Sequence, residues 1–316
     1  MDSSEVKVSV MMVTYNHEKY LEQAILSVLN QNVDFKYELL IGEDCSTDHT
    51  RKIAIRYHQL YPEIIRLTLH NKNVGALKNE ADLRRKCRGQ YIAVLEGDDY
   101  WTNMDKLKSQ VEFLDAHPKY IGVTHNVEVL DENGEKLPFS LEGIHHQKEH
   151  IYTKTDALDF KMIGHLSGWM YRNIWKSISG KEFELIKKCA VNSDVKLSVI
   201  LGYKGNVYFM EDTWSVYRRR MVGDGWSATH NNRNLELYYY ELNVRLRDLL
   251  EQCYNKKVDI QNKLLEHVYK SWLICVQTPS KENIRILFRL LCKKDVSKKN
   301  ICSYFLEQQL YRKGRK

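Results

Sequence analysis

The N-terminal third of the chain alternates short apolar runs with amphipathic helical patterns. Four runs are apolar and contain β-branched residues, as buried strands do, and they cover residues 6–13, 37–41, 64–69 and 91–95. Between them, apolar residues recur at every third or fourth position, which predicts helices over residues 21–29, over residues 49–60 and from the turn at 71–75 to about Cys87. This alternation predicts βαβ units, and therefore an α/β fold with a mostly parallel sheet flanked by helices.

Polar residues follow three of the four predicted strands. Thr14 and Tyr15 follow the first strand, Glu43 and Asp44 the second, and Asp98 and Asp99 the fourth. Ligands of such sheets bind in the crevice beyond the carboxyl ends of the strands. We therefore expect these three clusters to meet at one ligand-binding edge.

The fourth strand ends in three carboxylates, which belong to Glu96, Asp98 and Asp99. Burying them without partners is costly, and adjacent carboxylates repel one another unless a positive charge lies between them. A hard divalent ion with oxygen ligands meets this need, and a solvated loop is the alternative. Neither GxGxxG nor GxxxxGK[ST] occurs at the first strand-to-helix turn, which argues against the commonest α/β nucleotide-binding classes.

Four motifs in this order and spacing resemble those of a family 2 glycosyltransferase with the GT-A fold. They are VMMVTYN at 10–16, IGEDCSTD at 41–48, NVG at 73–75 and LEGDD at 95–99, and they cover about the first 115 residues. The resemblance implies a nucleotide-sugar donor, a single-displacement (inverting) reaction and a nucleotide-binding sheet.

The resemblance also implies roles for individual residues. Thr14 and Tyr15 would line the nucleotide pocket, and Asp44 would accept a hydrogen bond from a uracil N–H. The alternative for Thr14 and Asp44 is helix capping, because both precede helical patterns.

The same resemblance predicts a metal site at the acidic strand end. Asp98, together with Glu96 or Asp99, would hold Mg²⁺ or Mn²⁺ against the donor diphosphate. The family more often has Asp where Glu96 stands, so the identity of the direct ligands stays open.

A general base is expected in the segment 164–227, since the acceptor hydroxyl must lose a proton. Asp194 opens a helical pattern, and the resemblance places the base at this position; the alternative is an acid that stabilises the helix N-terminus. Glu211 and Asp212 form a rival pair that could instead cap the element after a strand-like run at 207–210. His165 is a weaker competitor, because a lone His is more often structural.

Three further residues of this segment are candidates for contacts with the substrate. Arg218 opens a run of three arginines, and guanidinium groups suit phosphate geometry. Trp226 lies near two glycines and fits a mobile loop that closes over the sugar. Trp169 could stack on a sugar face or fill the core.

The length and composition allow a catalytic domain with an appended part. The chain has 316 residues, of which 43% are hydrophobic, and we expect a GT-A domain over 1–230 and a helical region over 231–316. No run of about 18 apolar residues is present, and the N-terminus lacks an apolar signal-peptide core. Seven cysteines without paired spacing indicate reduced thiols, so a cytoplasmic protein is expected.

The positive charge of the chain is concentrated in its last segment. Residues 281–316 carry eleven Lys or Arg against three acidic residues, whereas the whole chain has a net charge of +7. An apolar stripe beside these cations comprises Ile284, Leu287, Phe288 and Leu291. This pattern fits a peripheral helix on an anionic membrane surface, and the alternative is a helix packed on the catalytic domain with a solvated basic face. No nucleic-acid reader motif accompanies the charge.

Taken together, the sequence predicts a metal-dependent, inverting glycosyltransferase. It would move a sugar from a UDP-sugar to a saccharide or lipid-linked acceptor in bacterial surface polysaccharide synthesis. A sugar nucleotidyltransferase and a non-catalytic nucleotide-binding scaffold are the alternatives.

Overall fold

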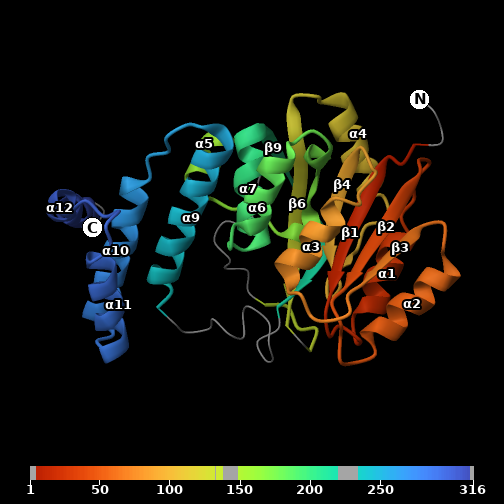
Figure 1. Cartoon of the computed structure of the whole chain (residues 1–316), viewed down its shortest axis with the longest axis horizontal. Coiled ribbons are helices and arrows are strands. Elements are labelled where there is room, and N and C mark those ends of the chain that lie inside the picture. The colour runs from red at the N-terminus through yellow and green to blue at the C-terminus, as the bar shows by residue number, and fades with distance from the viewer. Residues whose placement is uncertain (1–4, 132, 138–148, 220–233, 314–316) are drawn as a thin grey trace. The chain divides into compact units, whose positions relative to one another are not determined.

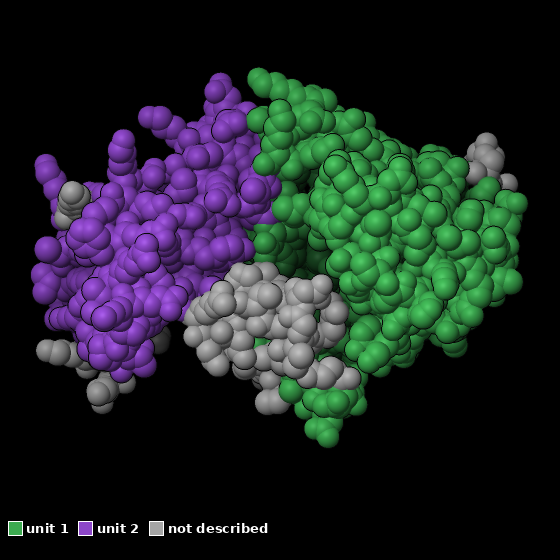
Figure 2. Space-filling model, turned by 60° about the horizontal axis from the view of Figure 1, so that its bottom comes forward, with its two compact units in different colours: residues 1–188, 192–221 green, residues 189–191, 222–316 purple. Residues whose placement is uncertain are grey.

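The computed structural model describes residues 5–131, 133–137, 149–219 and 234–313. Two compact units are present (Figure 2): unit 1 comprises residues 1–188 and 192–221, and unit 2 comprises residues 189–191 and 222–316. The predicted boundary between residues 230 and 231 lies outside the described residues.

The parallel half of the sheet in unit 1 is built from the four strands that the sequence predicts. They are β1 (Val8–Thr14), β2 (Tyr37–Glu43), β3 (Ile65–Leu69) and β4 (Tyr91–Glu96). β1 pairs in parallel with both β2 and β4, and β3 continues the parallel set beside β2. Because these strands run in the same direction, their carboxyl ends share one edge of the sheet.

The other half of the sheet is mixed. Its strands are β5 (Tyr100–Trp101), β6 (Tyr120–Leu130), β7 (His150–Tyr152), β8 (Met170–Arg172) and β9 (Asn206–Arg218). Within the described residues the strand order is β3-β2-β1-β4-β8-β6-β9-β5, with β7 beside β9. β4 meets β8 antiparallel, and β9 lies parallel to β6 but antiparallel to β5. The long strand β9 therefore ends next to the segment that follows the acidic end of β4.

Helices cover both faces of this sheet (Figure 1). They are α1 (Leu21–Leu29), α2 (Thr50–Leu60), α3 (Ala76–Arg84), α4 (Lys106–Ala116), α5 (Lys154–Leu158), α6 (Gly180–Lys188) and α7 (Ser193–Lys204), with short 3₁₀ turns η1 (Leu166–Gly168) and η2 (Ile174–Lys176). A core cluster joins α1, α2 and α4 to alternate residues of β1, such as Val8, Val10 and Met12. α3 packs against β1 and β2, where Asn79 Nδ2 donates to Gly42 O on β2.

Unit 2 is helical, as predicted for the C-terminal region. Its helices are α9 (Glu236–Tyr254), α10 (Gln261–Gln277), α11 (Lys281–Leu291) and α12 (Lys298–Lys313). α10 packs against the other three, and Leu246, Leu264, Val268 and Leu290 are fully buried. In the part of the chain that the structure describes, no helix is long and apolar enough to cross a membrane.

Candidate active site

The carboxyl ends of β1, β2 and β4 bring the predicted polar residues to one edge. Thr14 lies opposite Glu43 in the pairing of β1 with β2, and Val13 lies opposite Glu96 in the pairing of β1 with β4. The loops beyond β1 and β2 are joined by hydrogen bonds, since Asn16 N donates to Ser46 Oγ over 3.0 Å. The three clusters are thus held as neighbours by the register of the sheet.

Asp44 is buried and anchors the 73–75 motif. Its Oδ1 accepts a hydrogen bond from Val74 N (2.7 Å), and its Oδ2 accepts one from Gly75 N (2.9 Å). Each oxygen keeps a lone pair for a further donor. Asp44 thereby connects the end of β2 to the start of α3, where Gly75 is the residue before the helix and has a φ of 84°.

The helix-capping alternative is wrong for both residues to which it applied. α1 begins at Leu21 and its N-cap is Tyr20, whereas Thr14 lies at the end of β1. α2 begins at Thr50 after the N-cap His49, so Asp44 does not cap it either. Thr14 is buried, its Oγ1 has no hydrogen-bond partner among the described residues, and the neighbouring Tyr15 is half-buried.

The acidic turn, residues 96–99, packs tightly against β1. Gly97 N donates to Val13 O over 3.0 Å, and a Cβ added at Gly97 would lie 2.6 Å from Thr14 Oγ1. A side chain therefore cannot be placed at position 97 without displacing Thr14. The close approach brings the Asp98 carboxylate to 3.5 Å from Nε2 of His17, a residue of the β1 loop that the sequence analysis did not select.

Asp99 is the buried carboxylate of the turn. Its Oδ1 accepts a hydrogen bond from Arg218 N (2.9 Å), whereas its Oδ2 accepts none from any described residue. Burial, and then the charges of Asp98 and Glu96, raise the pKa of Asp99 well above its usual value. A cation at Oδ2 would offset the cost of ionising this carboxyl.

The structure adds His165 to the predicted acidic group. Ligand atoms of Glu96, Asp99 and His165 lie within 4.8 Å of one another, which is close enough for one metal ion, and Asp98 is not a member of this group. His165 Nδ1 is 3.8 Å from Asp99 Oδ2 and accepts a hydrogen bond from Ser167 N. Burial lowers the pKa of His165 to about 4, so the ring is neutral near pH 7, as a metal-binding imidazole must be.

Arg218, the last residue of β9, forms hydrogen bonds to the acidic turn. Its guanidinium lies between the rings of Tyr20 and Tyr100, 5.0 and 4.6 Å from their centroids. Its Nη1 donates to the carbonyl oxygen of Asp98, and its Nη2 donates to Gln23 Oε1. Both terminal nitrogens are therefore already engaged with the protein.

Asp194 lies in the first turn of α7 and is half-buried. Its Oδ1 accepts a hydrogen bond from Val195 N (2.8 Å). Burial is the largest cause that raises the pKa of Asp194; the Val195 hydrogen bond opposes this, and the nearby charge of Glu80 adds to it. Glu80 is itself paired with Arg84, which also donates to Ser193 Oγ over 2.8 Å.

The remaining predicted residues take different places. Glu211 and Asp212 are exposed inside β9, where the register against β6 shifts, so the alternative that they cap a following element is wrong. Their role as a rival general base stays a prediction. Trp169 is 2% exposed and donates from Nε1 to Gly164 O, which makes it a core residue. Trp226 lies outside the described residues.

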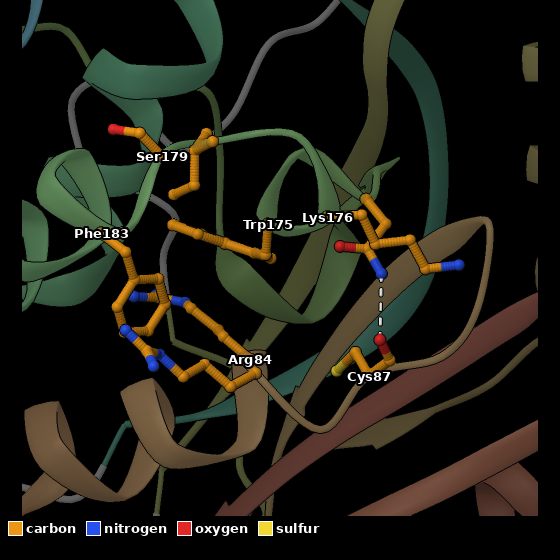
Figure 3. A pocket seen from close by; sticks show the side chains of 10 residues that line it. Arg84, Cys87, Trp175, Lys176, Ser179 and Phe183 are labelled. Carbon is orange, nitrogen blue, oxygen red and sulfur yellow. Dashed lines mark hydrogen bonds between the residues drawn. The ribbon is translucent and has the colours of Figure 1, made fainter.

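A cavity of about 330 Å³ lies at the C-terminal end of α3, where Arg84 and Arg85 line it (Figure 3). The Arg84 guanidinium lies 4.9 Å from the Trp175 ring centroid, and Arg85 lies 3.9 Å from that of Phe183. Arg84 is bound to Glu80 and Arg85 to Glu184, so these cations already have acidic partners. The cavity is not lined by the acidic turn.

Comparison with solved structures defines the fold class. The chain is similar to the crystal structure of residues 1–349 of Staphylococcus aureus TarS in complex with UDP-GlcNAc, with a TM-score of 0.64 and 16% identity over 98% of this chain and 92% of that one. The fold is therefore of the GT-A type, as the sequence predicts.

Residues 9–173 match Glycosyl transferase family 2, and the chain belongs to this family. An uncharacterized protein of Mycobacterium tuberculosis is 30% identical over 225 residues, which are 71% of this chain and 62% of that protein. The poly(ribitol-phosphate) beta-N-acetylglucosaminyltransferase TarS of Staphylococcus aureus is 29% identical over 140 residues, which are 43% of this chain and 23% of TarS. The chain thus spans less than two thirds of the length of these relatives.

Proposed function

We propose that this chain transfers a sugar from a UDP-sugar to a saccharide or lipid-linked acceptor with inversion at the anomeric carbon. The observation that carries the proposal is the cluster of Thr14, Asp44 and the acidic turn at one sheet edge in a member of glycosyltransferase family 2. TarS, with which the chain shares its fold, has been crystallised with UDP-GlcNAc. TarS is named as a poly(ribitol-phosphate) beta-N-acetylglucosaminyltransferase, and we propose by analogy that the acceptor of this chain belongs to a bacterial polymer.

The loops after β1 and β2 form the proposed nucleotide pocket. Thr14 and Tyr15 line it, and Asp44 accepts a hydrogen bond from the uracil N–H with a lone pair that its two backbone partners leave available. Because both Asp44 oxygens are held by Val74 and Gly75, the carboxylate is oriented before the nucleotide arrives. This preorganisation lowers the entropic cost of binding.

The acidic turn fits a divalent cation. Asp99 Oδ2 is buried without a hydrogen-bond donor among the described residues, and Glu96 and His165 place ligand atoms beside it. We propose that Asp98, with Glu96 or Asp99, would hold Mg²⁺ or Mn²⁺ against the donor diphosphate, and that His165 would complete the set of ligands. The ion, when bound, neutralises charge on the leaving diphosphate.

Asp194 is the proposed general base. The acceptor oxygen attacks the anomeric carbon, the bond from that carbon to the diphosphate oxygen breaks, and the acceptor proton passes to the Asp194 carboxylate. The products are the glycosylated acceptor and UDP, and one displacement gives inversion. The raised pKa of Asp194 suits this role, because a base is most effective when its pKa lies near the working pH.

Two predicted donor contacts stand as further proposals. Arg218 serves the donor by holding the Asp98 backbone, and its direct contact with the diphosphate remains a prediction, since Nη1 and Nη2 already have partners. Trp226 stays a predicted donor contact outside the described residues.

The first test is the binding of UDP, GDP and CDP by calorimetry with and without Mn²⁺. We expect metal-dependent binding of UDP that is lost in Asp98→Asn and kept in the matched control Asp34→Asn, an exposed carboxylate on the loop before β2. No nucleotide binding under any of these conditions would contradict the proposal.

The second test identifies the released product. Incubation with UDP-sugars and an acceptor should release UDP. Release of pyrophosphate from a nucleoside triphosphate and a sugar phosphate would instead identify a nucleotidyltransferase. Tight UDP binding without turnover of any donor, in a protein whose Asp194→Asn variant behaves identically, would favour the non-catalytic scaffold.

A further inference from the structure

Helix α11 carries apolar side chains that its own unit does not cover. The helix packs on α9 and α10 and buries Leu290 completely. Ile284 and Phe288, one turn apart, are 58% and 66% exposed. Large apolar side chains exposed next to each other on a helix are typical of an interaction surface.

A row of cations flanks these two side chains. Lys281, Arg285 and Arg289 are all exposed and recur at intervals of four residues, so they lie along one side of α11. None of the three forms an ion pair with a described residue, whereas Lys293, just beyond the helix, pairs with Glu241 over 2.8 Å. Glu282 is the one acidic residue of α11.

Two chemistries therefore meet on what we call the α11 face, which comprises Lys281, Ile284, Arg285, Phe288 and Arg289. Removing the apolar pair from water lowers the free energy, and so does placing the cations beside anions. A surface with an anionic layer over an apolar layer satisfies both requirements. The last helix of the same unit, α12, also exposes Leu306 and Leu310, at 61% and 69%.

We propose that the α11 face binds the surface of an anionic lipid bilayer, with Ile284 and Phe288 inserted among the acyl chains and the three cations at the lipid headgroups. A second copy of this chain is a poorer occupant, because it would bring two rows of like-charged side chains together. Nucleic acid would leave the apolar pair without a partner. Binding of the bilayer by the α11 face does not depend on the proposed function. If the proposed function also holds, a lipid-linked acceptor would be found at the same bilayer surface.

The test is co-sedimentation of the full chain with liposomes, either of phosphatidylcholine alone or of phosphatidylcholine mixed with phosphatidylglycerol. We expect binding to the anionic liposomes that weakens with added salt, and at least about tenfold weaker binding to neutral ones. Equal binding to the two compositions, or no binding to either, would overturn the proposal.

Two sets of variants separate the contribution of the apolar pair to lipid binding from that of the three cations. Ile284→Ser with Phe288→Ser, and separately Lys281→Gln with Arg285→Gln and Arg289→Gln, should each reduce binding at least about tenfold. The matched controls are Leu60→Ser, an exposed apolar residue of unit 1 (62%), and Lys36→Gln with Lys52→Gln and Lys119→Gln, three exposed cations of unit 1. Controls that lose binding as strongly as the α11 variants would contradict the assignment to this face.

Two further measurements on the same variants distinguish a loss of lipid binding from a loss of nucleotide binding and from a change in oligomeric state. Calorimetry with UDP should give unchanged affinity for both α11 variants, so a failure of lipid binding is distinguishable from a failure of the nucleotide site. Light scattering should show no change in oligomeric state. A wild-type oligomer that dissociates in the Ile284→Ser, Phe288→Ser variant would assign the face to self-association instead and overturn the proposal.

Discussion

Arg218 and Asp98 are joined across 120 positions of the chain, because Arg218 Nη1 donates a hydrogen bond to the carbonyl oxygen of Asp98. The same arginine donates its backbone N–H to Asp99 Oδ1. The end of β9 thus holds the backbone and one carboxylate of the acidic turn, and its guanidinium is itself held between Tyr20 and Tyr100. The position of the carboxylates depends on a residue that need not touch the substrate.

Removal of this support should loosen the acidic turn. We expect Arg218→Ala to weaken Mn²⁺-dependent UDP binding by about 10- to 100-fold, as loss of residues that orient metal ligands typically does. Calorimetry at several Mn²⁺ concentrations measures the effect, and Arg56→Ala, an exposed arginine on α2, is the control. If Arg218 contacted only the diphosphate, UDP affinity would fall without a change in its dependence on Mn²⁺.

Replacement of the proposed base should affect turnover more than binding. Asp194→Asn removes the proton acceptor but keeps the shape of the side chain, so we expect kcat to fall by about 10²- to 10⁴-fold with little change in UDP affinity. Steady-state kinetics with a turned-over UDP-sugar, paired with calorimetry, separates the two quantities. An Asp194→Asn variant with wild-type kcat would assign the base elsewhere.

The pH dependence of turnover should report the environment of Asp194. The carboxyl must be ionised to accept a proton, so kcat should fall as the pH drops through its raised pKa. Glu80→Gln removes a negative charge that helps to raise this pKa, and the acidic limb of the kcat profile should therefore move to lower pH. An unmoved limb would show that a different group titrates.

The contact between Gly97 and β1 should be intolerant of a methyl group. Since an added Cβ would lie 2.6 Å from Thr14 Oγ1, we expect Gly97→Ala to cost about 1–3 kcal/mol of unfolding free energy and to weaken UDP binding. Urea denaturation measures the stability. Gly180→Ala is the matched control, because nothing lies within 4 Å of its added Cβ, and it should leave both quantities close to those of wild type.

Glu38 should make the stability of unit 1 depend on pH in the acidic range. Burial acts to raise the pKa of Glu38, but hydrogen bonds from Ser9, Arg88 and Arg66 outweigh it, and the net pKa is lowered. A lowered folded-state pKa means that the stabilisation is complete above the unfolded value of 4.5 and is lost as the pH falls through the folded value.

Substitution of this residue tests the effect. Glu38→Gln should lose about 1–3 kcal/mol of unfolding free energy at pH 7, because Ser9, Arg66 and Arg88 lose a charged and buried acceptor, and progressively less as the pH is lowered below 4.5. Denaturation series at several pH values provide the measurement. The exposed Glu63→Gln should behave as wild type throughout, and an equal loss in both variants would contradict the assignment.

Local patterns were enough to predict the parallel half of the sheet. Residues 6–13, 37–41, 64–69 and 91–95 correspond to β1, β2, β3 and β4 within two residues at each end. The prediction succeeds because a buried strand is a short apolar run whose signal lies within a few neighbouring positions. The ordered strand ends then identified Thr14, Asp44 and the acidic turn as neighbours, since parallel strands share one carboxyl edge.

Contacts between distant segments were not predictable in this way. The group formed by Glu96, Asp99 and His165 joins β4 to the segment before η1, and no local pattern marks His165 as a neighbour of Asp99. β9 continues through Glu211 and Asp212 because a register shift against β6 accommodates them, although an acidic pair in sequence favours a strand end.

The sequence by itself therefore determined the fold class, the family and the edge of the sheet that carries the site, because each depends on periodicity or on short motifs. Only the tertiary structure decided which side chains complete that site and which face of α11 remains exposed. The physical reason is that hydrogen bonds such as that between Arg218 and Asp98, and burial such as that of Leu290, arise only when segments far apart in the chain pack together.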